Sequence, residues 1–207
     1  MSWWVDHVVP HIADKSLGTD LVRRRRETVC AGLHGRVLEI GFGSGHNAAL
    51  YPPEVTEVHA VEPNDVAWRM AEPRIATCAI PVRRAGLDGQ LLDEPDDAFD
   101  CVLSTFTLCT IPDQRAALTE VRRVLRPGGS FHFLEHGLSP DAKVARWQHR
   151  LEPLQRRFAG GCHLTRDPVA DLAAVGLEVG DVDRGYLPGP GPSKPFGYLY
   201  RGTARST

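Results

Sequence analysis

The sequence has no long hydrophobic run and no strong charge of either sign. No stretch approaches the ~18 consecutive apolar residues of a membrane-spanning helix, so we expect no membrane span. Acidic and basic residues nearly balance, at 26 Asp and Glu against 24 Lys and Arg. The net charge of -2 lacks the positive field with which general nucleic-acid-binding proteins hold phosphates, so no nucleic-acid partner is expected.

Cysteines are also few. There are 5, an odd number, and no two form a C-x-x-C pair. This usage is typical of reduced thiols and not of a disulfide scaffold or a zinc knuckle. The first residues, MSWWVDHVVPHIADKSL, are too polar for a secretion signal, and we therefore expect a cytoplasmic protein.

Short apolar runs alternate with segments of helical periodicity, and the length of 207 residues fits a single domain. Strands are expected at 36–40, 57–62, 80–85, 99–106, 130–136, 176–183 and 196–204. Helices are expected at 46–51, 64–77, 113–125, 141–158 and 166–174. This alternation predicts an α/β fold with a mostly parallel sheet. The Pro/Gly-rich stretch 188–195 predicts a hairpin, which makes the last strand antiparallel.

The most informative segment is VLEIGFGSG at 37–45, where a strand ends and three glycines follow. Glycines permit a tight turn and a close approach of a ligand to the main chain. Glu62 ends the next expected strand, where a carboxylate can accept hydrogen bonds from both ribose hydroxyls. A dinucleotide fingerprint would need glycine at the position of His46, which disfavours a nicotinamide cofactor. A purely structural turn is the other alternative.

The motif E-x-G-x-G-x-G, Glu62 and the later LRPGG resemble the class I S-adenosylmethionine-dependent methyltransferases, of the methyltransferase domain 11 type, over about residues 35–203. The segments GFGSGHNAALYPP, VLSTFTLCTIPD, LRPGGSFHFLEH and GGCHLTRD resemble more closely the branch that includes animal thiol S-methyltransferases. The resemblance implies a Rossmann-like seven-stranded mixed sheet, with helices on both faces and the last strand antiparallel.

The resemblance also implies a cofactor site for S-adenosylmethionine, with S-adenosylhomocysteine as the product. Glu39 would lie near the methionine ammonium group, and Glu62 would bind the ribose diol. Segments 63–64 and 87–88 would flank the adenine, and 104–106 would line the methyl-transfer cavity. The complete set implied for the cofactor is Glu39, Gly41, Phe42, Gly43, Gly45, Asn47, Glu62, Pro63, Asn64, Leu87, Asp88, Ser104, Thr105 and Phe106.

A small, apolar acceptor is expected, with a thiol favoured because a thiol of pKa ~8.5 needs little help to ionise. His136, at the end of the 130–136 strand, is the candidate catalytic residue on the acceptor side. Two alternatives stay open. One is a phospholipid, quinone or phenol methyltransferase at a membrane surface, and the other is a non-catalytic S-adenosylmethionine-binding partner subunit.

The remaining segments receive structural assignments. Residues 1–34 are expected to form a helical cap or lid, and 35–207 the core, with a small cover at 137–165. The run 23–26 is interpreted as a solvated helix face, and the stripe of Trp147, Leu151 and Leu154 as core. His132 and His136 share a strand face ~13 Å apart, so no metal site is expected. Peripheral membrane contact through the N-terminal tryptophans and the oligomeric state stay open.

Overall fold

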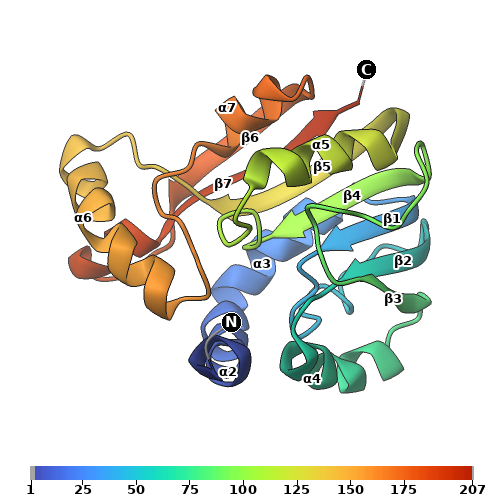
Figure 1. The fold of residues 1–207 in the computed structure, drawn as a ribbon, viewed down its shortest axis with the longest axis horizontal. Coiled ribbons are helices and arrows are strands. Elements are labelled where there is room, and N and C mark those ends of the chain that lie inside the picture. Colours follow the sequence, from blue (N-terminus) through green and yellow to red (C-terminus); the bar gives the residue numbers. More distant parts are fainter. Residues whose placement is uncertain (1–2, 207) are drawn as a thin grey trace.

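A seven-stranded mixed sheet forms the centre of residues 3–206, the part of the chain that the computed structural model describes (Figure 1). Its strands run in the order β3-β2-β1-β4-β5-β7-β6, and β7 is antiparallel to both of its neighbours. The strands are β1 Gly35–Ile40, β2 Val55–Val61, β3 Val82–Gly86, β4 Phe99–Thr105, β5 Leu125–His136, β6 Glu178–Tyr186 and β7 Tyr198–Arg205. The predicted fold class, with its antiparallel last strand, is confirmed.

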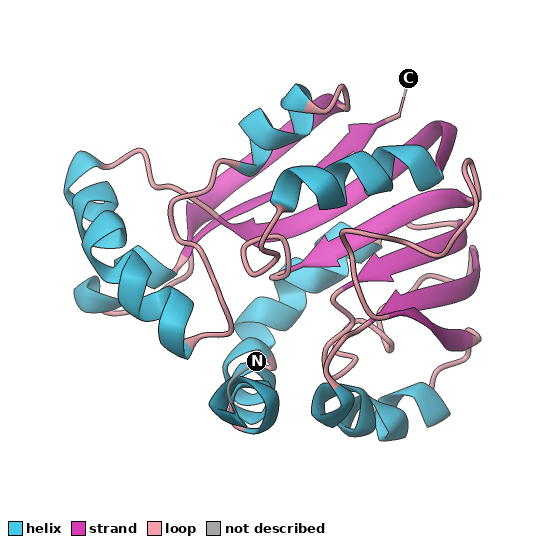
Figure 2. Cartoon of the chain, viewed as in Figure 1, coloured by secondary structure: helices cyan, strands magenta, loops and turns pink. Residues whose placement is uncertain are grey.

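Helices cover both faces of this sheet, with α5 and α7 on the near face and α3 behind it (Figure 2). Four helix starts, those of α4 to α7, are capped by Asn or Asp side chains that accept hydrogen bonds from first-turn amides, as expected for N-caps. The helices are α1 Trp3–His7, α2 Val9–Leu17, α3 Asp20–Cys30, α4 Asp65–Ala76, α5 Gln114–Val124, α6 Ala142–Phe158 and α7 Pro168–Ala174, with a 3-10 helix η1 at Gly191–Phe196.

The helix expected at 46–51 is absent, and that prediction was wrong. The segment forms successive turns, in which Ala48 N donates to Gly45 O and Leu50 N donates to Asn47 O. Both bonds span three residues, and the Pro52-Pro53 pair that follows cannot continue a helix.

Alternate residues of the central strands pack against opposite helix layers. One set contacts α5: Leu38, Ile40, Val102, Phe131 and Phe133. The other set contacts α3: Val37, Cys101, Leu103 and Leu134. Strands buried on both faces read as continuous apolar runs, which is why their positions could be predicted.

The strand register decides where a functional site can form. Ile40 of β1 pairs with Val61 of β2 and with Ser104 of β4, and Thr105 pairs with Leu134 of β5. The residues that follow β1, β2, β4 and β5 therefore meet at one edge of the sheet, where ligands bind in open α/β folds.

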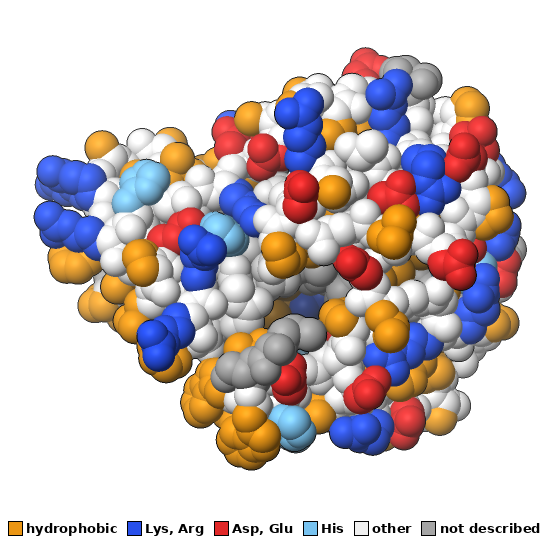
Figure 3. All heavy atoms as spheres, in the orientation of Figure 1, with side chains coloured by type: hydrophobic (Ala, Val, Ile, Leu, Met, Phe, Trp, Pro, Cys, Tyr) orange, Lys and Arg blue, Asp and Glu red, His pale blue; other side chains and the backbone are white. Residues whose placement is uncertain are grey.

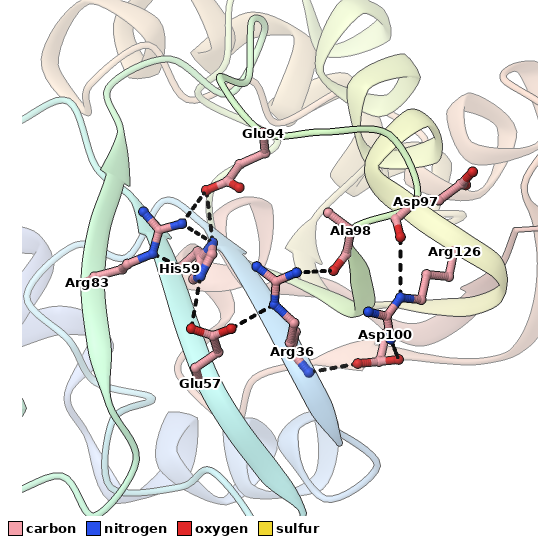
Figure 4. A network of polar contacts seen from close by, with 9 residues as sticks. All are labelled: Arg36, Glu57, His59, Arg83, Glu94, Asp97, Ala98, Asp100 and Arg126. Atoms are coloured by element: carbon pink, nitrogen blue, oxygen red, sulfur yellow. Dashed lines mark hydrogen bonds and ion pairs between the residues drawn. The ribbon is translucent and has the colours of Figure 1, made fainter.

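A separate polar network ties together the opposite, amino-terminal edge of the sheet (Figure 4). Arg36 Nε donates to Glu57 Oε1 over 2.7 Å, and Arg36 N donates to Asp100 Oδ2 over 2.8 Å. His59 Nδ1 lies 2.8 Å from Glu94 Oε1. These contacts join the strand starts, and we assign them to fold stability.

Candidate functional site

Three glycines with left-handed backbone carry the chain away from β1. Gly41, Gly43 and Gly45 have φ of 72°, 58° and 78°. A Cβ atom on Gly41 would lie 2.0 Å from Oγ1 of Thr107, so only glycine fits between the loops after β1 and β4. A Cβ on Gly43 would meet nothing closer than 4.0 Å. The main chain at Gly43 is thus open to a ligand.

Glu62 closes β2 directly beside this loop. Its Oε2 accepts a hydrogen bond of 2.7 Å from Gly43 N, and its Oε1 accepts one of 2.8 Å from Asn64 N. Burial raises the pKa of Glu62 despite these two bonds. A carboxylate oxygen has two lone pairs, so each oxygen retains capacity for one hydroxyl donor. The geometry suits recognition of a diol.

Glu39 lies beneath the loop, 1% exposed, within a network of neutral and basic partners. Asn47 Nδ2 donates to its Oε1 over 2.9 Å, and the Tyr51 hydroxyl donates to its Oε2. Burial raises the pKa of Glu39 to about 7. Asn47 also donates to Thr105 Oγ1 over 3.1 Å, which links the ends of β1 and β4.

Arg26 of α3 completes this network. The interpretation of the run 23–26 as a solvated helix face was therefore wrong for Arg26. The side chain is 5% exposed, and Nη1 donates to Asn47 Oδ1 over 3.0 Å and to Thr105 Oγ1 over 2.5 Å. Its Nε is buried without a hydrogen-bond partner among residues 3–206. Val22, Arg26, Val29 and Cys30 form the buried face of α3, and this helical spacing was the signal that sequence reasoning missed.

Several other residues expected in the cofactor site have side chains that do not join the network of Glu39, Asn47 and Thr105. Phe42 packs instead against Trp68, with ring centroids 5.5 Å apart. Ser104 donates to Glu135 Oε1 over 2.8 Å, away from the Thr105 network on the other face of β4. Exposed side chains are found at Pro63, Leu87 and Asp88.

The N-terminal helices lie against the glycine loop. Asp14 Oδ1 of α2 accepts a hydrogen bond of 2.7 Å from Ser44 Oγ and lies 3.0 Å from Arg74 Nη1. The backbone oxygen of Asp14 lies 3.2 Å from His46 Nε2. Closer to the chain start, Asn64 Nδ2 donates to Asp6 O over 3.0 Å. Figure 3 shows a hollow in the surface near the N-terminal helices and the carboxyl ends of β1 and β4.

His136 lies at the end of β5 beside Cys109 and Cys162, which the sequence analysis did not bring together with it. Its ring lies 5.1 Å from that of Phe106, and its Nδ1 is 3.9 Å from Cys109 Sγ. Cys162 Sγ is 3.4 Å from Cys109 Sγ. Burial would lower the pKa of His136, but the hydrogen bond and charge of Cys162 outweigh burial and raise it. The three residues are 27 and 26 positions apart along the chain, so no local motif reveals the cluster.

Helix α6 leaves most of the predicted core stripe exposed. Trp147 is 54% and Leu154 is 57% exposed, so the core interpretation was wrong for both. The buried Gln148 anchors the helix by donating to Gly137 O over 3.0 Å and to Pro195 O over 3.1 Å. Within residues 3–206, no helix has the length and hydropathy needed to cross a membrane.

Comparison with known sequences places this chain among methyltransferases. Residues 38–133 match the methyltransferase domain family. Thiol S-methyltransferase TMT1B of Rattus norvegicus is 34% identical over 174 residues, which are 81% of this chain and 69% of the rat protein. The Homo sapiens TMT1B is 38% identical over 68% of this chain and 60% of its own length. The phosphatidylethanolamine N-methyltransferase of Cereibacter sphaeroides is 30% identical over 60% of this chain and 63% of its own length.

Solved structures share the fold. A putative methyltransferase from Bacillus halodurans superposes with a TM-score of 0.69 at 17% identity, over 90% of this chain and 98% of that one. A geranyl diphosphate methyltransferase in complex with S-adenosylmethionine superposes with a TM-score of 0.70 at 14% identity, over 89% and 85% of the two chains. At these identities the likeness establishes the architecture alone.

Proposed function

Because this chain belongs to the S-adenosylmethionine-dependent methyltransferase family, we propose that it methylates a small, largely apolar thiol. The observation that carries the proposal is the similarity to thiol S-methyltransferases over 81% of the chain. The carboxyl edge of the sheet agrees with it, because Phe106 and His136 form a largely apolar site wall there.

We propose that the carboxyl edge of β1, β2 and β4 holds the cofactor. Glu62 would accept hydrogen bonds from the ribose hydroxyls, and the open main chain at Gly43 would admit the methionine portion. The unpartnered Nε of Arg26 is a buried donor that a carboxylate would satisfy, which assigns the methionine carboxylate to Arg26. Glu39, through Asn47, would hold this arrangement and balance the ammonium group.

The bound cofactor would supply an electrophilic methyl group on a sulfonium. A thiol acceptor would lose its proton and take that methyl group as a thiolate, which would give a thioether and leave S-adenosylhomocysteine. The protein must align the acceptor and exclude water, and no covalent enzyme intermediate is required. His136 would lie on the acceptor side of the site.

Two segments of the chain are candidates for enclosing an acceptor. We propose that α1 and α2 act as a lid, because Asp6 and Asp14 contact Asn64 and the glycine loop. Segment 137–165 would form the opposite cover.

An acceptor panel tests the proposal directly. Production of S-adenosylhomocysteine would be measured with small alkyl and aryl thiols, with phenols and quinones, and with lipid amines. We expect turnover with thiols, and failure with every thiol would reject the thiol assignment. Calorimetry with S-adenosylmethionine runs alongside. Binding without turnover on any acceptor would favour the non-catalytic partner subunit.

A second candidate is a methyltransferase whose acceptor lies in a membrane surface. Trp3 is 69%, Leu154 57% and Phe158 50% exposed, and Trp4 Nε1 donates to Phe158 O over 3.0 Å, so α1 and the end of α6 form one apolar surface. Figure 3 shows hydrophobic side chains gathered along this lower edge. Such a surface suits the membrane interface. Sedimentation with phosphatidylcholine and anionic vesicles separates this candidate from methylation in solution.

A further inference from the structure

Two cysteines and one histidine converge from three separate elements at the carboxyl edge of the sheet. Cys109 lies in the loop after β4, His136 ends β5, and Cys162 lies in the loop between α6 and α7. Their ligand atoms all lie within 4.8 Å of one another. Cys109 is 2% and Cys162 is 5% exposed. No other group of three His, Cys, Asp or Glu side chains in the described part of the chain reaches this proximity.

From this convergence we infer that Cys109, His136 and Cys162 form a binding site for a thiophilic divalent cation, zinc, with a fourth coordination position left open toward the acceptor. The ion site stands on the geometry alone. Its role toward the acceptor rests on the proposed thiol methylation.

The interatomic distances suit this ion. In tetrahedral zinc sites with Zn–S ~2.3 Å and Zn–N ~2.0 Å, neighbouring ligand atoms lie about 3.5–3.8 Å apart. The Sγ atoms of Cys109 and Cys162 are 3.4 Å apart, and Nδ1 of His136 is 3.9 Å from Cys109 Sγ. Shifts of a few tenths of an ångström would place all three around one ion. Thiolates and imidazole are the ligands that zinc prefers over hard cations.

The surroundings hold the three ligands in place. His163 N donates to Cys109 O over 2.8 Å, which joins the two cysteine loops. Arg166 braces the first loop by donating to the carbonyls of Leu108 and Ile111.

Three protein ligands are the number found in catalytic zinc sites, where the fourth position takes water or substrate. The cluster lies beside the methyl-transfer cavity, because the Phe106 ring contacts His136 on one side and lies 5.1 Å from the Arg26 guanidinium carbon. A thiol that binds the open position would release its proton and present a thiolate sulfur, since metal ligation requires the deprotonated form. The released proton passes to solvent, and the sulfur then accepts the methyl group as described above.

The test measures metal in the full-length protein. We expect about one zinc ion per chain by mass spectrometry after purification. Replacement of zinc by Co²⁺ should give thiolate-to-cobalt charge-transfer absorption and the visible bands of a four-coordinate ion. Reduced protein that binds neither ion would overturn the site, and so would a purified protein whose Cys109 and Cys162 form a disulfide and which binds no zinc after reduction.

Substitutions assign the ligands. Cys109→Ser, Cys162→Ser and His136→Asn should each weaken zinc binding by at least about 100-fold. Cys101→Ser is the matched control, because Cys101 is buried and its Sγ lies 3.4 Å from Nδ1 of His34, but it does not belong to the group of three ligand residues. Equal effects of Cys101→Ser and Cys109→Ser would overturn the assignment. If a variant fails to fold, the cobalt spectrum of the unaltered protein still decides whether thiolates bind the ion.

Removal of zinc by a chelator separates the ion's role from the proposed function. We expect unchanged affinity for S-adenosylmethionine, a fall of at least about tenfold in thiol methylation, and recovery when zinc is restored. Undiminished methylation without zinc would overturn the role at the acceptor while the thiol function stands. If the protein binds zinc but methylates no thiol, the inferred ion site stands and the proposed function is rejected.

Discussion

Glu62 connects the glycine loop to the start of α4 through one carboxylate. Replacing it with alanine removes both potential hydroxyl acceptors and the bond to Gly43 N. We expect Glu62→Ala to weaken binding of S-adenosylmethionine by about 2–3 kcal/mol, the value of hydrogen bonds to a charged group. Calorimetry measures the change, with Glu178→Ala, at an exposed position of β6, as the control. An unaltered affinity would remove Glu62 from the cofactor site.

Titration of the Glu39 carboxyl should make the free energy of unfolding fall as the pH rises. Burial raises its folded-state pKa to about 7, whereas the unfolded carboxyl titrates near ~4.3. Between these values the folded state binds more protons, so stability falls as pH rises and levels off above the folded pKa. This difference in pKa corresponds to about 4 kcal/mol over that window. Denaturation from pH 4 to pH 8 should show a shallower decline in Glu39→Gln than in the unaltered protein, and parallel curves would contradict the expectation.

Arg26 and Arg24 lie on the same helix but in opposite environments. Arg24 is exposed, whereas Arg26 donates to Asn47 and Thr105 inside the protein. We expect Arg26→Met to lower the unfolding free energy by about 2–4 kcal/mol and to weaken cofactor binding, because it strips buried acceptors of their donor. Arg24→Met should change stability by less than about 0.5 kcal/mol. Urea denaturation of both variants decides, and equal effects would contradict the buried role.

At the scale of single elements, burial on two faces made prediction reliable. Each strand expected from an apolar run is present, since β1 and β4 alternate contacts between α3 and α5 without a polar side. The segment 46–51 failed because Asn47 is fixed by Glu39 and Thr105, and those contacts come from other strands. Helical periodicity describes a segment's own spacing and carries no information about such distant partners.

The attachment of α2 to the glycine loop can be weakened at one residue. Asp14 accepts from Ser44 and lies within 3.0 Å of Arg74, and it is partly exposed. If α1 and α2 act as the proposed lid, Asp14→Ala should accelerate dissociation of S-adenosylmethionine by roughly fivefold, equivalent to about 1 kcal/mol. Stopped-flow displacement measures this rate. Asp20→Ala, at the exposed start of α3, serves as control, and a lid role is rejected if the two variants behave alike.

At the scale of the whole molecule, the two halves of the site differ in how far sequence could reveal them. The glycine loop and Glu62 follow consecutive strands, so a parallel sheet places them together by rule. Cys109, His136 and Cys162 meet only because α6 returns the chain over the end of β5. Cysteine spacing along the chain therefore could not reveal a cluster assembled by tertiary folding.

The position of β7 in the sheet also orders events during synthesis. β7 inserts between β5 and β6, and it pairs with the second half of β5, from Ser130 opposite Arg205 to His136 opposite Leu199. While a ribosome is still making residues 137–197, one edge of β5 has no partner, although β1 to β4 are already complete. Domains generally fold as units, so we expect the sheet to close only after β7 has emerged. The last strand to be made is thus the one that joins β6 to the rest of the sheet.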